Sequence, residues 1–309
     1  MDNIYLLMLI AIVVLAVADI IVGVSNDAIN FLNSAIGSKA ISIRTIMIVA
    51  SLGIFIGAVF SSGMMEVARK GIFVPAQFQF GEIMLIFMAV MITDILLLDF
   101  FNTLGMPTST TVSIVFNLLG AAVVMSLIKI SHSETETLAD LGTYINTAKA
   151  LEIISGILLS VVIAFSVGAL VQWISRILFT FNYERRVALT DITYFIFLKG
   201  LKGTPYYKDL KGILVGNEIY VILISFAFWV LFSFIFEKLT KKTVLLVVIA
   251  IGTFGLALAF SGNDLVNFIG VPMAAYHSYE AWVAGGMDTT MSMAVLDKKV
   301  PAEPVLLFI

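Results

Sequence analysis

Two short polar signatures follow hydrophobic runs in distant parts of the chain. The first spans residues 24–31 and the second spans 261–268, and both contain the pattern Asn-Asp-x-x-Asn-Phe. Each has a glycine nearby, Gly23 in one and Gly262 in the other. Residues three and four apart lie on neighbouring faces of a helix, so each copy gathers its polar side chains. The candidate binding residues are Asn26, Asp27 and Asn30 in the first copy, and Asn263, Asp264 and Asn267 in the second.

The side chains of these signatures suit both a cation and an oxyanion. Carboxylate and amide oxygens are hard ligands that fit Na⁺, and amide N–H groups donate to anion oxygens. The sodium candidates are Asp27, Asn30, Asp264 and Asn267. A carboxylate at membrane depth costs about 2.5–3.5 kcal/mol on insertion scales, which favours a functional role. The alternative is that Asn-Asp caps a helix end at the membrane interface.

A segment rich in hydroxyl groups, residues 105–111, has the sequence Gly-Met-Pro-Thr-Ser-Thr-Thr. Its hydroxyl groups follow a glycine and a proline, and they could begin a helix whose free N–H groups point at an anion. Ser109, Thr110 and Thr111 are therefore candidate binding residues. An ordinary capped turn between two helices is the alternative.

Two further carboxylates lie within apolar runs. Asp94 is in the middle of the third run, and Asp19 precedes Asn26 by seven residues on roughly the same helical face. Such carboxylates are candidates for ion coupling or gating, as cation ligands or proton sites. A structural hydrogen bond to a neighbouring helix is the alternative for Asp94. Gly53 and Gly57 form a Gly-x-x-x-Gly pattern, which is typical of close helix packing.

The elements that must position these residues are membrane-spanning helices. The chain has 309 residues, of which 60% are hydrophobic and only 13% are charged, with a mean hydropathy of +1.06. Soluble domains carry about 25% charged residues. Apolar runs of span length occur at 4–24, 45–65, 83–104, 111–128, 153–175, 219–236 and 243–263. In lipid such runs must be helices, because backbone groups cannot stay unpaired. We therefore predict an all-α polytopic membrane protein with about seven apolar helices, re-entrant or broken helices, and an internal repeat.

Charge in the loops predicts three parts of the chain. Residues 1–175 form a first transmembrane repeat, 176–217 a basic cytoplasmic loop, and 218–309 the start of a second repeat. The positive-inside rule places 131–150 outside the cell. If the predicted spans alternate in direction, the loop with the lysines at 238–242 falls outside the cell, which conflicts with the positive-inside rule. The same alternation gives the two signatures the same direction across the membrane. An inverted repeat therefore requires a re-entrant hairpin or a miscounted segment.

Several classes of function lack support in the sequence. No basic tract with interleaved aromatic residues points to nucleic acid. Cysteine is absent, which excludes disulfides, zinc–thiolate sites and iron–sulfur clusters. His132 and His277 are not clustered, so a transition-metal site is not expected. No nucleophile–base constellation, nucleotide loop or organic cofactor motif is visible, and we predict neither an enzyme nor an ATP-driven pump.

Together, the two Asn-Asp signatures and the segment 107–111 resemble the inorganic phosphate transporter family. That resemblance implies cation and phosphate contacts from the candidate residues named above. The family's histidine after Ser-Thr-Thr is Val112 here, which favours sodium over proton coupling. A second Pro-Ser-Thr-Thr segment at the same spacing after the second signature would fall beyond Ile309, and we therefore expect the sequence to be part of a longer transporter.

The resulting expectation is a secondary active transporter for inorganic phosphate coupled to a cation, Na⁺ or alternatively H⁺. A sulfate permease of the same family is the nearest alternative. A channel or a non-transporting membrane scaffold is the alternative from another class. The expected location is the cell inner (plasma) membrane, as a multi-pass protein in contact with lipid, with a homo-oligomer compatible with the sequence.

Overall fold

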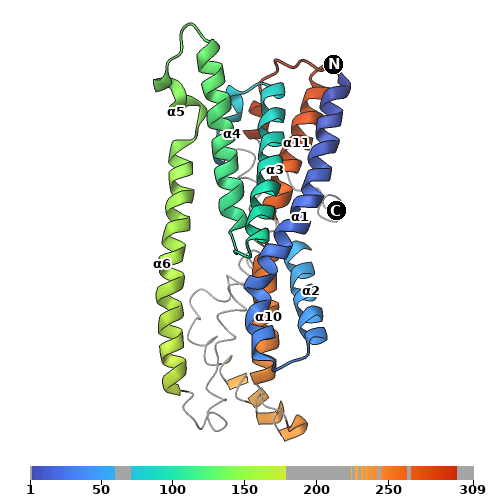
Figure 1. The fold of residues 1–309 in the computed structure, drawn as a ribbon, viewed down its shortest axis with the longest axis vertical. Coiled ribbons are helices and arrows are strands. Elements are labelled where there is room, and N and C mark those ends of the chain that lie inside the picture. Colours follow the sequence, from blue (N-terminus) through green and yellow to red (C-terminus); the bar gives the residue numbers. More distant parts are fainter. Residues whose placement is uncertain are drawn as a thin grey trace. The chain divides into compact units, whose positions relative to one another are not determined.

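A computed structural model describes residues 2–59, 71–178, 245–262 and 266–297, together with isolated positions between 224 and 241. These residues are helical, with no strand among them and only two isolated bridges, so the all-α prediction is confirmed. Figure 1 shows the helices, with α5 as a single short turn. Their bounds are α1 Asp2–Ser38, α2 Ile43–Val59, α3 Phe80–Thr103, α4 Thr110–His132, α5 Leu141–Tyr144, α6 Thr147–Leu178, α10 Leu245–Phe260 and α11 Val266–Ala284, with 3₁₀ turns η2 Pro75–Gln77, η3 Leu138–Asp140 and η7 Ala294–Asp297.

Within the described residues, four helices are long and apolar enough to cross a membrane, namely α1, α3, α4 and α6. The predicted number of about seven stays a prediction, because the basic loop beyond Leu178 and more than half of the run at 219–236 lie outside the described residues. Helix α11 was not predicted. Its polar residues, among them His277 and Glu280, and the internal Pro272 hide it from a search for continuous apolar runs.

The chain folds into two compact units that are not continuous in sequence. One comprises Met1–Asn30, Ser62–Ile157 and Asn263–Ile309, and the other comprises Phe31–Ser61 and Leu158–Gly262. The first unit contains most of α1 with α3, α4 and α11, which lie side by side in Figure 1. The division into 1–175, 176–217 and 218–309 stays a prediction.

In the first unit, α1 presents one buried stripe to its neighbours. The buried positions recur at alternating intervals of three and four, which is the pattern of nearly parallel helix packing. Helix α3 runs in the same direction as α1, because Tyr5 packs on Phe80 (ring centroids 4.9 Å apart) while Asn26 binds Asn102 further along both helices. The buried stripe consists of Leu9, Ile12, Ala16, Asp19, Gly23 and Asn26.

Helix α11 runs antiparallel to α1. Phe268, near the start of α11, packs against Gly23, whereas Trp282, near its end, packs against Tyr5 with the ring centroids 5.3 Å apart. The helices that carry the two signatures therefore have opposite directions. An inverted repeat requires opposite directions, whereas the alternation of the predicted spans gave the two signatures the same direction.

The first signature lies within a single helix. The first apolar run was expected to end at residue 24, but α1 continues without a break to Ser38. The second signature is described only in part: α10 before it ends at Phe260, and α11, which contains its last residues, begins at Val266. Polar side chains on α1 bind laterally to α3 and to the chain after it, and the backbone of α1 keeps its own hydrogen bonds.

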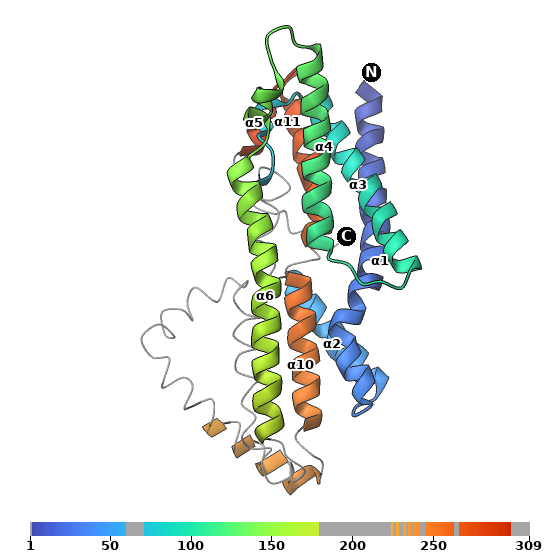
Figure 2. The same cartoon turned by 60° about the vertical axis from the view of Figure 1, so that its left-hand side comes forward.

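Helices α3 and α4 form a hairpin with a polar turn (Figure 2). Gly105 has φ +66°, a left-handed conformation that suits glycine at a helix end. At the other end of the hairpin, Lys129 of α4 forms an ion pair with Glu82 of α3 at 2.8 Å and donates to the carbonyl of Gln77 at 3.0 Å. The hairpin is therefore closed by the turn at one end and by the contacts of Lys129 at the other.

Beside this ion pair, α5 covers the segment before α3. The Tyr144 hydroxyl donates to Glu136 at 2.7 Å, and the Tyr144 ring packs on Phe78. The Lys129 ammonium lies 5.8 Å from the centroid of the Tyr144 ring. Burial of the side chain, followed by the hydrogen bond and negative charge of Glu136, raises the pKa of Tyr144 to about 12.

In the second unit, the predicted close packing at Gly53 and Gly57 is confirmed. A Cβ at Gly53 would lie 2.6 Å from the carbonyl oxygen of Phe254 in α10. A Cβ at Gly57 would lie 2.6 Å from the carbonyl oxygen of Leu258. The Ser261 hydroxyl donates to the carbonyl of Ile54 at 2.7 Å. Helices α2 and α10 thus approach each other backbone to backbone.

We expect Gly53→Ala to destabilise this helix pair. The added methyl group meets a backbone carbonyl, which cannot move aside, and such overpacking costs about 1–3 kcal/mol. Gly252→Ala in α10 is the matched control, because no atom lies within 4 Å of its Cβ position. Thermal melting in detergent should show a lower Tm for Gly53→Ala alone, and equal Tm values for the two variants would contradict the close packing.

We expect the Tyr144 phenol to titrate near pH 12 in the folded protein. Its raised pKa means that the neutral phenol stabilises the fold below the ordinary tyrosine pKa of about 10. That stability is lost as the pH rises through about 12. The measurement is the ultraviolet difference titration of the wild type against Tyr144→Phe. Glu136→Gln should move the midpoint back toward 10, and a wild-type midpoint already near 10 would refute the burial of this hydroxyl.

Candidate functional site

The first signature and the hydroxyl segment meet at one polar pocket in the first unit. Asp27 and Asn30 of α1 line one side, and the turn Pro107, Thr108, Ser109 and Thr110 before and at the start of α4 lines the other. The pocket volume is about 290 Å³, far above the roughly 10–15 Å³ that one water needs. The structure thus brings together two sets of residues that are separated in the sequence by the whole of α2 and α3.

The Asn26 side chain holds the turn against α1. Its amide nitrogen donates to the Asn102 side chain at 2.8 Å and to the carbonyl of Met106 at 3.2 Å. Its amide oxygen accepts from the Thr108 backbone N–H at 2.8 Å. Asn26 is only 3% exposed. All three contacts are made to protein, so Asn26 lies behind the pocket and sets the position of its wall.

Asn102 completes this clamp and was not singled out from the sequence. Its amide nitrogen donates to the carbonyl of Val22 at 2.9 Å while its oxygen accepts from Asn26. The side chains of Asn26 and Asn102 therefore each bind the opposite helix, and together they link α1 to α3 beside the first signature. The signal for Asn102 in the sequence was an amide side chain near the end of a largely apolar run.

The start of α4 points into the pocket. Ser109 caps the helix, since its hydroxyl accepts from the Val112 N–H at 3.4 Å and its carbonyl accepts from the Ser113 N–H at 3.0 Å. Thr110 is 1% exposed, and its hydroxyl has no hydrogen-bond partner among the described residues. First-turn N–H groups have no acceptor within their own helix and attract anions. Thr111, also a candidate, is half-buried and does not line the pocket.

The opposite wall carries negative charge. Asp27 is 3% exposed, and the Asn30 amide donates to its Oδ1 at 3.5 Å. Asn30 itself is exposed. A buried carboxylate repels an anion placed beside it, and this repulsion is strong at low dielectric. The pocket can therefore hold an oxyanion at the α4 N-terminus only if a cation lies near Asp27.

The second signature is described only in part. Asn263 and Asp264 lie outside the described residues, and Asn267 lies in the first turn of α11. Phe268, the next residue, is fully buried, and a Cβ at Gly23 would come 2.1 Å from the Cζ of its ring. The start of α11 thus lies against the first signature, and only a glycine at position 23 permits that contact.

Asp19 and Asp94 meet at a second polar cluster in the same unit. Both side chains are fully buried. The Ser113 hydroxyl and the Asn117 amide both donate to Oδ1 of Asp94, the latter at 2.8 Å. Ser113 and Asn117 were not singled out from the sequence, although their four-residue spacing in an apolar helix was a signal.

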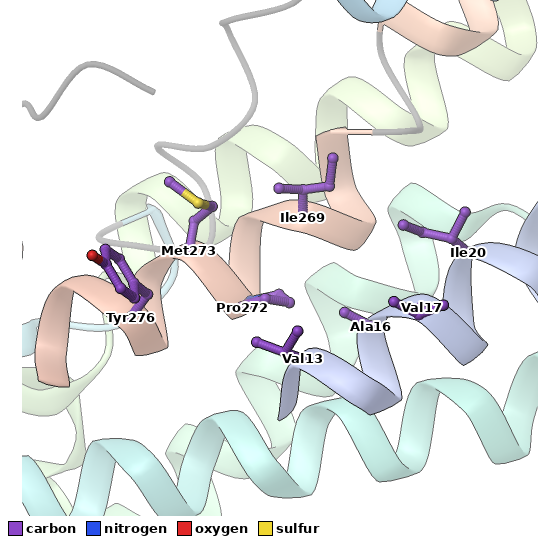
Figure 3. Close-up of a pocket in the computed structure, with 8 residues that line it drawn as sticks. All are labelled: Val13, Ala16, Val17, Ile20, Ile269, Pro272, Met273 and Tyr276. Atoms are coloured by element: carbon purple, nitrogen blue, oxygen red, sulfur yellow. The ribbon is translucent and has the colours of Figure 1, made fainter. Parts of the chain in front are cut away.

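A smaller cavity of about 70 Å³ between α1 and α11 is apolar (Figure 3). It carries no group that could neutralise a charge, so it does not suit an ion or an oxyanion. Its lining residues are Val13, Ala16, Val17, Ile20, Ile269, Pro272, Met273 and Tyr276.

Comparisons with known proteins identify the family and the fold. A sequence profile described as the phosphate transporter family matches residues 23–302. Among solved structures, one described as the sodium-dependent phosphate transporter is similar, with a TM-score of 0.65 and 20% sequence identity. That match covers 97% of this chain and 72% of the other, and at this identity it shows the fold. The comparison with curated proteins finds no match.

We expect Asn26→Ala to destabilise the protein. The truncation leaves the Thr108 N–H, the Met106 carbonyl and the Asn102 amide oxygen without the partner they have now, and each unpaired buried polar group costs about 1–3 kcal/mol. The matched control is Ser25→Ala, because the Ser25 hydroxyl bonds only within its own helix, to Ile21. Melting temperatures measured side by side should separate the two variants, and an Asn26→Ala protein as stable as Ser25→Ala would contradict the clamp.

Proposed function

The chain belongs to the phosphate transporter family, and on that premise we propose that it carries inorganic phosphate across the membrane in symport with Na⁺. The observation that carries this proposal is the polar pocket of α1 and the α3–α4 turn. A helix N-terminus with hydroxyl groups faces a buried carboxylate across a pocket with a volume of about 290 Å³. These are complementary sites for an anion and a cation in one pocket.

The anion would bind at the start of α4. The hydroxyls of Ser109 and Thr110 and the first-turn N–H groups supply donors for the oxygens of phosphate. The Thr110 hydroxyl is buried and has no hydrogen-bond partner among the described residues. The Asn26 clamp fixes the backbone of Thr108, so these donors are held in place before the anion arrives.

The cation would bind beside Asp27, with Asn30 as a further oxygen ligand. Its charge offsets the repulsion between Asp27 and phosphate, so anion and cation bind cooperatively. Position 112 holds valine, which removes one proton carrier from the segment. The printed name of the similar solved structure also describes a sodium-dependent protein. Asp264 and Asn267 are proposed as the corresponding ligands of the second signature.

Transport would follow from an inverted repeat that exposes the pocket to each side in turn. The antiparallel packing of α1 and α11 supports this arrangement. Two other assignments are compatible with the same pocket chemistry. Sulfate is also a tetrahedral oxyanion that these donors would accept, and a proton could replace Na⁺ as the coupling ion. A channel or a scaffold is the alternative from another class.

The test is uptake of radiolabelled phosphate into proteoliposomes that contain the full-length protein, with and without a Na⁺ gradient. Saturable, Na⁺-dependent uptake that excess sulfate does not inhibit would support the proposal. Uptake driven by a proton gradient instead would overturn the choice of ion. Sulfate uptake without phosphate uptake would overturn the substrate, non-saturable flux would indicate a channel, and no flux in folded protein would indicate a scaffold.

We expect Asp27→Asn to lower Na⁺-dependent uptake by about 10- to 100-fold, because the amide keeps one oxygen ligand but loses the negative charge that attracts the cation. Such a fold-change corresponds to about 1.4–2.8 kcal/mol. Asp99→Asn is the matched control, since Asp99 is an exposed carboxylate on α3. Initial uptake rates at several Na⁺ concentrations measure the effect. Equal rates for the two variants would remove Asp27 from the cation site.

A further inference from the structure

The cluster around Asp19 and Asp94 lies apart from the oxyanion pocket. Its members come from three helices, Asp19 from α1, Asp94 from α3, and Ser113 with Asn117 from α4. Asp19 precedes Asp27 by eight residues, which corresponds to roughly 12 Å along a helix. Neither aspartate lines the polar pocket. The proposed binding of phosphate leaves this cluster without a role.

Among the described residues, donors are found for only one of the four aspartate oxygens. Ser113 and Asn117 both bind Oδ1 of Asp94. Within the described part of the chain, both oxygens of Asp19 and Oδ2 of Asp94 have no donor, although they are buried. The two carboxyl groups nevertheless lie within hydrogen-bonding reach of each other. Asp19 thus reaches from α1 into the α3–α4 cluster, where the described group that it meets is the carboxyl group of Asp94.

Two adjacent buried carboxyl groups require positive charge between them. The described residues that interact with them are Ser113 and Asn117, which are neutral. A shared proton would satisfy two of the three remaining oxygens and leave the third unpaired. A small hard cation can contact all three, and the Ser113 hydroxyl oxygen can add a further ligand. The Asn117 amide holds Asp94 in place.

We propose that Asp19 and Asp94, together with Ser113, bind a sodium ion at a site separate from the oxyanion pocket, with Asn117 positioning Asp94. Because α1, α3 and α4 each supply ligands, the bound ion holds the α3–α4 hairpin against α1. The Asn26–Asn102 clamp lies further along the same two helices. Sodium at this site therefore stabilises the arrangement in which the oxyanion pocket is formed.

The test is equilibrium binding of radioactive sodium to the purified full-length protein without phosphate, so that a failure of the proposed transport does not affect the result. We expect Asp19→Asn and Asp94→Asn each to lower the number of sodium ions bound per chain by one. Asp99→Asn, the exposed carboxylate of the same helix α3, should bind as the wild type does. Asp27→Asn should retain the sodium of this cluster and lose it when combined with Asp94→Asn.

A second variant keeps the test decisive if the aspartate variants do not fold. Asn117→Ala keeps both carboxylates and removes the amide that positions Asp94, so sodium should bind in the same number but about 10-fold more weakly. Sodium binding by folded Asp19→Asn or Asp94→Asn that equals the wild type in number and affinity would overturn the proposal. In that case the pair shares a proton or is bridged by water.

Discussion

The side chain of Asn26 makes the contacts on which the candidate site depends. One buried amide binds the Asn102 side chain, the Met106 carbonyl and the Thr108 N–H, and it thereby fixes the turn between two helices against a third. Within a bilayer no water is available to replace these partners, so the cost of breaking them is the full desolvation of each group. The position of the α4 N-terminus beside Asp27 follows from this clamp.

The same constraint explains the buried stripe of α1. In its first half the stripe consists of the apolar residues Leu9, Ile12 and Ala16, whose buried side chains form no hydrogen bonds. Asp19 and Asn26 continue the stripe at the same seven-residue interval, and each meets a polar residue on α3, at Asp94 and Asn102 respectively. Because lipid cannot solvate these groups, their pairing fixes the register of α1 against α3 more strongly than apolar packing could.

Residue types and spacing predicted the helical class and the close packing at Gly53. The family resemblance implied that the first signature and the hydroxyl segment contribute to one binding site. Residue types and spacing did not predict Asn102, Ser113 or Asn117, because a single amide or hydroxyl in an apolar run carries no direction until its neighbour across the interface is known. Helix α11 was missed since its polar residues lower its hydropathy. The continuation of α1 to Ser38 was missed because the lateral partners that satisfy its polar face come from distant sequence.

Charge explains why two separate polar sites on one helix are useful to a symporter. Phosphate beside Asp27 would place like charges together in a low-dielectric pocket, so the anion can bind only when positive charge is present. A cation at Asp27 would act directly on the anion, whereas a cation at Asp19 and Asp94 would act on the packing of α1 with α3 and α4. In the proposed function, the cation at Asp27 would control whether phosphate is held, and the cation at Asp19 and Asp94 would control whether the pocket that holds it is assembled. Coupling of ion and substrate can therefore arise from both electrostatics and helix packing, with Asn26 as the physical link between the two sites.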